Sequence, residues 1–127
     1  MTDILRDAAE LLKHEKDAKG WCQRFTDRAI TKISPSHSLP DASTAKRSLH
    51  LMKKNPGKYG YRAVHDLDRP YTLVYFDNCG GHPKFAPEEW CGHVGIYCKA
   101  TKMIYSSVDY KMSPAWMKKR AGFYVPK

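Results

Sequence analysis

The amino-acid sequence predicts an α+β domain in which N-terminal helices pack on a C-terminal antiparallel sheet. Two observations support this prediction. Apolar residues recur at the helical period through about residues 1–56, and β-rich runs bounded by turn residues replace that pattern over about residues 70–127. Helices followed by neighbouring strands are typical of the α+β class. The 127 residues, 42% of them hydrophobic, suffice for one core, so we expect a single domain over residues 1–127.

The first half is expected to hold three helices. The first begins at Thr2, its expected N-cap, and ends near residue 19, where a glycine follows. A second helix starts at once and has Cys22 in its first turn. Asp41 is expected to cap a third helix, which an Asn-Pro-Gly sequence at 55–57 ends. The apolar positions that predict these helices are Ile4, Leu5, Ala8, Leu11 and Leu12; Cys22, Phe25, Ala29 and Ile30; and Ala42, Ala45, Leu49 and Met52.

The second half is expected to form an antiparallel meander. Its predicted strands are Tyr71–Phe76, His93–Cys98, Lys102–Ser107 and Phe123–Val125. Residues 99–101 would join the middle two strands as a short hairpin. Ser113-Pro114 would begin a turn or helix before the last strand. Residues 58–70 alternate only weakly, and no element is predicted there.

The net charge of +9 favours anionic partners without naming their class. Nucleic acid, acidic wall polymers and membrane surfaces all qualify, but the basic residues form no long stripe interleaved with aromatic residues, so we expect no specific nucleic acid. No apolar run approaches the roughly 20 residues of a membrane helix, and the N-terminus lacks a secretion-signal pattern. We therefore expect no transmembrane segment and synthesis in the host cytoplasm without a signal peptide. We also expect a monomer. Its four cysteines are expected to be free thiols.

Cys22 and His93 are the candidate catalytic residues. At the start of a helix, unpaired N–H groups and the positive end of the dipole favour a thiolate at Cys22. His93 opens a strand, and Gly95 beside it would leave room for a helix to approach. A thiolate nucleophile with a distant histidine as general base is a recognised arrangement. Each residue also has a purely structural interpretation, Cys22 as a small buried apolar residue and His93 as a hydrogen-bonded core histidine.

These motifs resemble those of papain-like cysteine peptidases of the CHAP and NlpC types, most of all the peptidase domains of phage endolysins. The resemblance rests on Gly20-Trp21-Cys22-Gln23-Arg24-Phe25, on the strand Tyr71-Thr72-Leu73-Val74-Tyr75-Phe76 and on Gly92-His93-Val94-Gly95-Ile96-Tyr97, within roughly residues 20–127. It implies a papain-like fold with Cys22 as nucleophile and His93 as base. It also implies hydrolysis of a peptide or amide bond in bacterial peptidoglycan by a phage-encoded or prophage-encoded enzyme. We expect no cofactor and no catalytic metal.

The residue that would orient the His93 imidazole is left between two candidates. In NlpC-type relatives a polar residue lies on the next strand, where this chain has Tyr105. Phage-lysin relatives often carry an aspartate just beyond that strand, which here is Asp109. We choose Asp109 because a carboxylate holds an imidazolium better than a phenol does, although Asp109 also fits a turn cap.

A zinc-stabilised basic nucleic-acid-binding module is the alternative from another class. Cys79, His82, Cys91 and His93 supply two thiols and two imidazoles, which is the inventory of a structural zinc site. The Cys-x-x-His spacing of the first pair fits half of such a site. The Cys-x-His spacing of the second pair is tight, and the prolines and glutamates between the pairs fit an exposed loop. One tightly held zinc in protein purified without chelator would favour this module.

Overall fold

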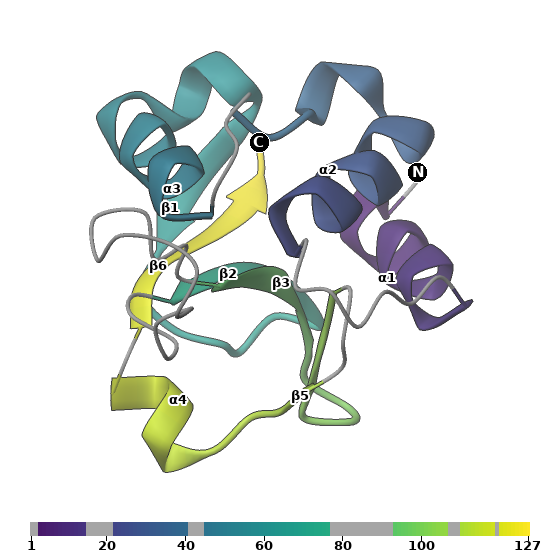
Figure 1. Cartoon of the computed structure of the whole chain (residues 1–127), viewed down its shortest axis with the longest axis vertical. Coiled ribbons are helices and arrows are strands. Elements are labelled where there is room, and N and C mark those ends of the chain that lie inside the picture. Colours follow the sequence, from purple (N-terminus) through teal and green to yellow (C-terminus); the bar gives the residue numbers. More distant parts are fainter. Residues whose placement is uncertain (1–2, 15–21, 41–44, 77–92, 107–109, 119) are drawn as a thin grey trace, which may run out of the picture.

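Helices and an antiparallel sheet make up the protein, so the predicted α+β class is confirmed (Figure 1). The computed structural model describes residues 3–14, 22–40, 45–76, 93–106, 110–118 and 120–127. The helices within these ranges are α1 (Ile4–His14), α2 (Cys22–Ile33), α3 (Ala45–Lys54) and α4 (Pro114–Lys118), with short 3-10 helices η1 (Pro35–His37) and η2 (Pro56–Tyr59). The strands are β1 (Tyr61–Val64), β2 (Tyr71–Phe76), β3 (His93–Cys98), β4 (Met103–Tyr105), β5 (Tyr110–Lys111) and β6 (Arg120–Pro126). None of the described helices is both long and apolar enough to span a membrane.

The sheet runs in the order β1-β6-β2-β3-β4-β5, and each neighbouring pair is antiparallel. β2, β3 and β4 form a meander, as predicted, and β5, which was not predicted, extends it. The turn between β3 and β4 places Lys102 in the left-handed region with φ 58°. β6 instead inserts between β1 and β2. The prediction of a meander throughout is therefore wrong, because the C-terminal strand lies inside the sheet and pairs on both sides.

Each face of the sheet carries its own cluster of buried side chains, since residues alternate along a strand. The face covered by α1, α2 and α3, here called the helix face, presents Leu73, Tyr75, Val94, Ile96, Cys98, Tyr105 and Tyr124. The opposite face, here called the α4 face, presents Val64, Val74, Phe76, Tyr97, Ile104, Phe123 and Val125, and Met117 of α4 packs against this cluster. Figure 1 shows α4 across the sheet from the other three helices.

The start of α1 differs from the prediction in its capping residue. The Asp3 carboxylate accepts a hydrogen bond from the Arg6 N–H at 3.0 Å, and the Asp3 carbonyl accepts the Asp7 N–H. Asp3 therefore takes the capping role predicted for Thr2, which lies outside the described residues. The helical period is confirmed, because the residues of α1 that face the sheet are the buried Leu5, Ala8, Ala9 and Leu12.

A buried hydrogen bond fixes the rotation of α3 on the helix face. The hydroxyls of Ser48 and Tyr75 are 2.8 Å apart, and both side chains are fully buried. Ala45, Leu49 and Met52 are buried beside them, as the apolar period predicts. The predicted cap Asp41 and core residue Ala42 lie outside the described residues.

Two strands are absent from the prediction, and a third is longer than predicted. In β1 the burial pattern is buried, exposed, exposed, buried, so residues 61–64 lack the alternation that identifies a strand from sequence. β5 has two residues and pairs only with β4 among the described strands. β6 begins at Arg120, three residues before the predicted Phe123, because pairing with β2 continues through an irregularity opposite Tyr75 and Phe76.

Candidate active site

The helix that begins at the predicted nucleophile packs along the strand that begins at the predicted base (Figure 1). α2 has Cys22 as its first described residue, and the residues before it, on which the predicted helix start depends, lie outside the described residues. Four residues later, the buried Thr26 hydroxyl donates to the carbonyl of Val94 at 3.4 Å, directly after His93 in β3. One turn of helix rises about 5.4 Å, so the backbone of Cys22 lies about one turn from this contact. The Cys22 side chain is outside the described part of the structure.

His93 is buried at the end of the sheet, with 6% of its surface exposed. It lies opposite Phe76 in β2, and the two rings stack with centroids 6.3 Å apart and planes inclined at 24°. Its Nε2 is 3.4 Å from the Ser106 hydroxyl oxygen, a long hydrogen bond. Burial disfavours the charged imidazolium and lowers the pKa of His93 from 6.5 to about 4. The imidazole is therefore neutral at pH 7, which is the protonation state of a general base.

Gly95 makes room for β4 and Ser106, and the predicted approach of a helix at this position is wrong. A Cβ at Gly95 would lie 2.7 Å from Ile104 Cγ2 and 2.9 Å from the Tyr105 carbonyl oxygen. α2 packs instead on the helix face, where Val94 is buried. The same Cβ would lie 3.4 Å from the Ser106 Cβ. A glycine at position 95 thus allows the Ser106 hydroxyl to reach His93.

Ser106 is a site residue that the sequence prediction missed. The hairpin register pairs Ile96 with Tyr105, so the next position along, Ser106, falls opposite Gly95 on the face that carries His93. The predicted hairpin, with residues 99–101 as its turn, would instead pair Cys98 with Lys102 and place Tyr105 opposite Gly95. The observed turn spans residues 99–102 and pairs Cys98 with Met103, so the predicted register is wrong by one residue and Ser106 takes the position opposite Gly95.

Tyr105 and His93 lie on opposite faces of the sheet. The Tyr105 ring belongs to the cluster on the helix face, where Lys13 Nζ lies 5.0 Å from the ring centroid. Its hydroxyl oxygen is 3.0 Å from Thr101 Oγ1 at the hairpin turn. Of the two candidate orienting residues, Tyr105 is therefore not brought to the imidazole.

Several predicted site residues lie outside the described residues. They are Asp109, the preferred orienting residue, and Cys79, His82 and Cys91 of the zinc alternative. His93 is the described member of that zinc set, and it stacks on the Phe76 ring and lies within hydrogen-bond distance of the Ser106 hydroxyl. Over the described ranges, no three histidine, cysteine or acidic side chains gather in a metal-binding group. Cys98, at the far end of β3, is buried and not in a disulfide, as predicted for a free thiol.

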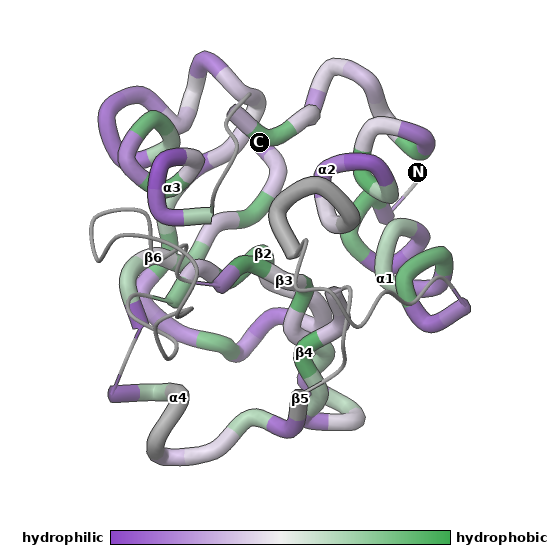
Figure 2. The backbone as a smooth tube through the Cα atoms, viewed as in Figure 1, coloured by the Kyte–Doolittle hydropathy of each residue, from purple (hydrophilic) through white to green (hydrophobic). Residues whose placement is uncertain are grey.

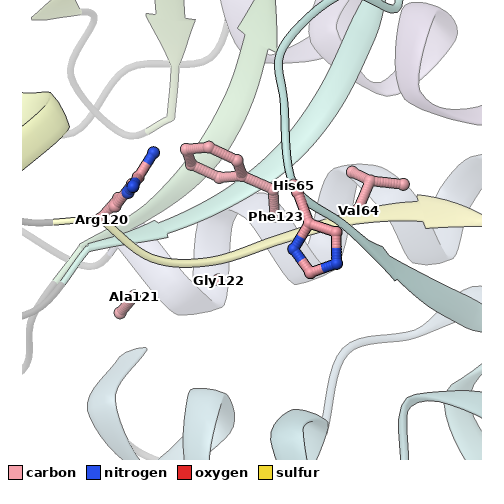
Figure 3. A pocket seen from close by; sticks show the side chains of 6 residues that line it. All are labelled: Val64, His65, Arg120, Ala121, Gly122 and Phe123. Carbon is pink, nitrogen blue, oxygen red and sulfur yellow. The ribbon is translucent and has the colours of Figure 1, made fainter.

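A pocket of about 270 Å³ opens beside β1 and β6, at the same end of the sheet as His93 (Figure 3). Its described lining is Val64, His65, Arg120, Ala121, Gly122 and Phe123. Arg120 is the strand partner of Phe76, whose ring stacks on His93, so the pocket lies two strands from the imidazole. This lining contains no nucleophile, and the candidate active site is therefore placed at α2 and β3.

No protein-family model, no curated protein and no solved structure matches this chain.

Proposed function

We propose that the protein is a papain-like cysteine hydrolase that cleaves a peptide or amide bond in bacterial peptidoglycan. The observation that supports this proposal most is the packing of α2, which begins at Cys22, against the strand that begins at the buried, neutral His93. The choice of peptidoglycan, of an endolysin-like enzyme and of a phage source comes from the motif resemblance. In this proposal the enzyme is made in the host cytoplasm and acts as a monomer on the cell wall.

The position of His93 at the start of its strand makes the proposed pairing geometrically reasonable. Its ring is on the α4 face and α2 is on the helix face, so the thiol must reach the ring around the end of the sheet. In this proposal the path runs past the end of β3, since His93 is the first residue of that strand among the described residues. The helix start adds unpaired N–H groups next to Cys22, which would stabilise a thiolate and the oxyanion that follows.

In the proposed reaction, His93 takes the thiol proton of Cys22 on Nδ1 while Ser106 holds Nε2. The sulfur attacks the amide carbonyl, the C–N bond breaks, and the imidazolium returns its proton to the leaving amine. Water then hydrolyses the thioester with His93 again as base. Because burial keeps the imidazole neutral, the thiolate forms during attack and is not stored as an ion pair beforehand.

Digestion of purified peptidoglycan tests this proposal. Cys22→Ser and His93→Gln should abolish the release of new amine-bearing or carboxyl-bearing fragments, as read by mass spectrometry. Cys98→Ser, at a buried cysteine at the other end of the same strand, is the matched control and should retain activity. Thermal unfolding of each variant shows that the fold is kept. Full activity in Cys22→Ser would refute the proposal.

A further inference from the structure

α3 and the residues that follow it, through β1, form one of two strongly basic stretches of the chain. Residues 45–64 contain Lys46, Arg47, Lys53, Lys54, Lys58 and Arg62 and no aspartate or glutamate, so this stretch contributes +6. The whole chain has 22 lysines and arginines against 13 acidic residues, a net charge of +9. A second basic stretch is residues 110–127, which contain Lys111, Lys118, Lys119, Arg120 and Lys127 and no acidic residue and so contribute +5. The first stretch differs in that four of its cations belong to one helix, α3.

The fold turns these cations outward on one side of α3. At 100° per residue, Lys46, His50 and Lys53 lie within a narrow arc of the helix, and all three are exposed. The opposite arc is buried against the sheet and includes Ser48, whose hydrogen bond to Tyr75 fixes the rotation of the helix. In Figure 2, α3 is largely purple, the colour of hydrophilic residues, at the periphery of the molecule.

The same surface continues beyond the end of α3. Lys58 is exposed in η2, and its Nζ lies 5.8 Å from the centre of the Tyr59 ring. The Nζ of Lys127, after β6, is 3.2 Å from the place that a Cβ on Gly57 would occupy. We define the basic surface of α3 as Lys46, Arg47, His50, Lys53, Lys54, Lys58 and Lys127.

We propose that the basic surface of α3 binds a linear polymer of polyol phosphates, an anionic wall polymer without nucleobases. The cations of α3 run from Lys46 to Lys54, and at 1.5 Å per residue they extend over about 12 Å, which suits a chain of phosphodiesters better than one isolated phosphate. Binding would be electrostatic and would release counterions from the polymer. The choice of a cell-wall polymer as the partner rests on the proposed function. The charge and geometry of the basic surface are independent of that function.

The chemistry of the surface separates this partner from the two other polyanions. Single-stranded nucleic acid is usually held by aromatic stacking platforms as well as by cations. On this surface the described aromatic residue is Tyr59, which packs partly on the core and lies beneath Lys58. A helix that inserts into a membrane interface needs a broad apolar face beside its cations. In α3, Leu49 and Met52 are buried in the core, and the half-buried Leu51 is the one apolar side chain left partly exposed.

Direct binding tests the surface without any hydrolysis. The probe is purified poly(glycerol phosphate) labelled at one end, and fluorescence anisotropy gives its affinity between about 50 and 200 mM salt. The test variant changes Lys46, Lys53 and Lys54 to glutamine. The matched control changes Lys102, Lys111 and Lys118 to glutamine, three exposed lysines on other elements, and so has the same net charge. Each variant is also tested for unchanged thermal unfolding.

The two triple variants should differ although their charges are equal. Because the α3 variant loses three phosphate contacts, its affinity should depend less steeply on salt, with a slope of log affinity against log salt that is less negative by about 2. Its affinity near 0.1 M salt should fall by about tenfold or more. The control should stay within about threefold of the wild type. Equal losses would assign binding to the overall field of the protein and overturn the proposal. Tighter binding of a single-stranded oligonucleotide or of anionic phospholipid vesicles than of poly(glycerol phosphate) would overturn the choice of partner.

If the protein does not cleave peptidoglycan, the comparison of the two triple variants still decides whether the basic surface of α3 binds the polymer. If it does, the α3 variant should cleave a small soluble peptidoglycan fragment at the wild-type rate and lose activity on intact walls that carry the polymer. Wild-type activity of the α3 variant on both substrates would show that the surface has no role in wall recognition.

Discussion

The burial of His93 predicts a specific dependence of stability on pH. Its pKa is about 4 in the folded protein and near 6.5 in the unfolded chain, so the unfolded state binds the extra proton between these values. Stability from this group is therefore complete above about pH 6.5 and falls as the pH drops toward 4. The linkage relation gives a loss of about 2 kcal/mol between pH 7 and pH 5 from these two pKa values.

Urea unfolding of the wild type and of His93→Gln at both pH values measures this loss. Glutamine does not titrate, so the variant should lack about 2 kcal/mol of the wild-type decrease between pH 7 and pH 5. His65→Gln, at an exposed histidine, is the matched control and should keep the wild-type decrease. Equal decreases in the wild type and in His93→Gln would refute the claim that burial holds this imidazole neutral.

Three further predictions follow from the geometry of the site. On a soluble substrate, kcat/KM should fall to half of its plateau value near pH 4 as the pH is lowered, because His93 must be neutral to act as base. A midpoint near pH 6.5 would contradict the burial of His93. Ser106→Ala should lower turnover several-fold and Tyr105→Phe should not, with thermal unfolding as the check on folding; the opposite result would return the orienting role to the tyrosine. Gly95→Ala should destabilise the protein by about 1–3 kcal/mol in urea unfolding because its Cβ meets packed β4 atoms. Gly57→Ala meets the flexible end of a lysine and should cost less, and equal costs would contradict the packing argument.

The elements with a strong local period were predictable from the sequence. Leu5, Ala8 and Leu12 repeat at the helical period and are buried in α1. The β-rich run at residues 71–76 is β2 with its predicted bounds, and residues 93–98 are β3. In these segments the apolar pattern repeats within a few neighbouring residues. It can therefore be recognised in the sequence without knowing which elements the segment packs against.

The long-range pairing was not predictable in the same way. β6 pairs with both β1 and β2, and nothing in the local sequence of residues 120–126 states which strands lie beside it. β1 was missed for a related reason. Its buried residues Tyr61 and Val64 are three positions apart, so burial in this strand does not alternate and leaves no strand pattern in the sequence. The partners of a strand are set by the packing of the whole sheet.

The candidate site was predictable in its residues but not in its arrangement. The helix start at Cys22 and the strand start at His93 both follow from local patterns. The contact of His93 with Ser106 depends on the register of β3 and β4 and on the space left by Gly95. The stacking of Phe76 on His93 depends on the pairing of β2 with β3, so neither contact is visible in the motif itself.

The central claim is that the thiol of Cys22 is the nucleophile of a peptidoglycan hydrolase. The most direct measurement is the intact mass of the protein, quenched in acid during turnover of a peptidoglycan fragment, followed by peptide mapping of any acyl adduct. We expect a thioester on the peptide that contains Cys22, and we expect none in Cys22→Ala. The acid quench preserves this adduct because thioesters persist at low pH. An adduct on the peptide of Cys79, Cys91 or Cys98, or fragment release that continues in Cys22→Ala, would contradict it.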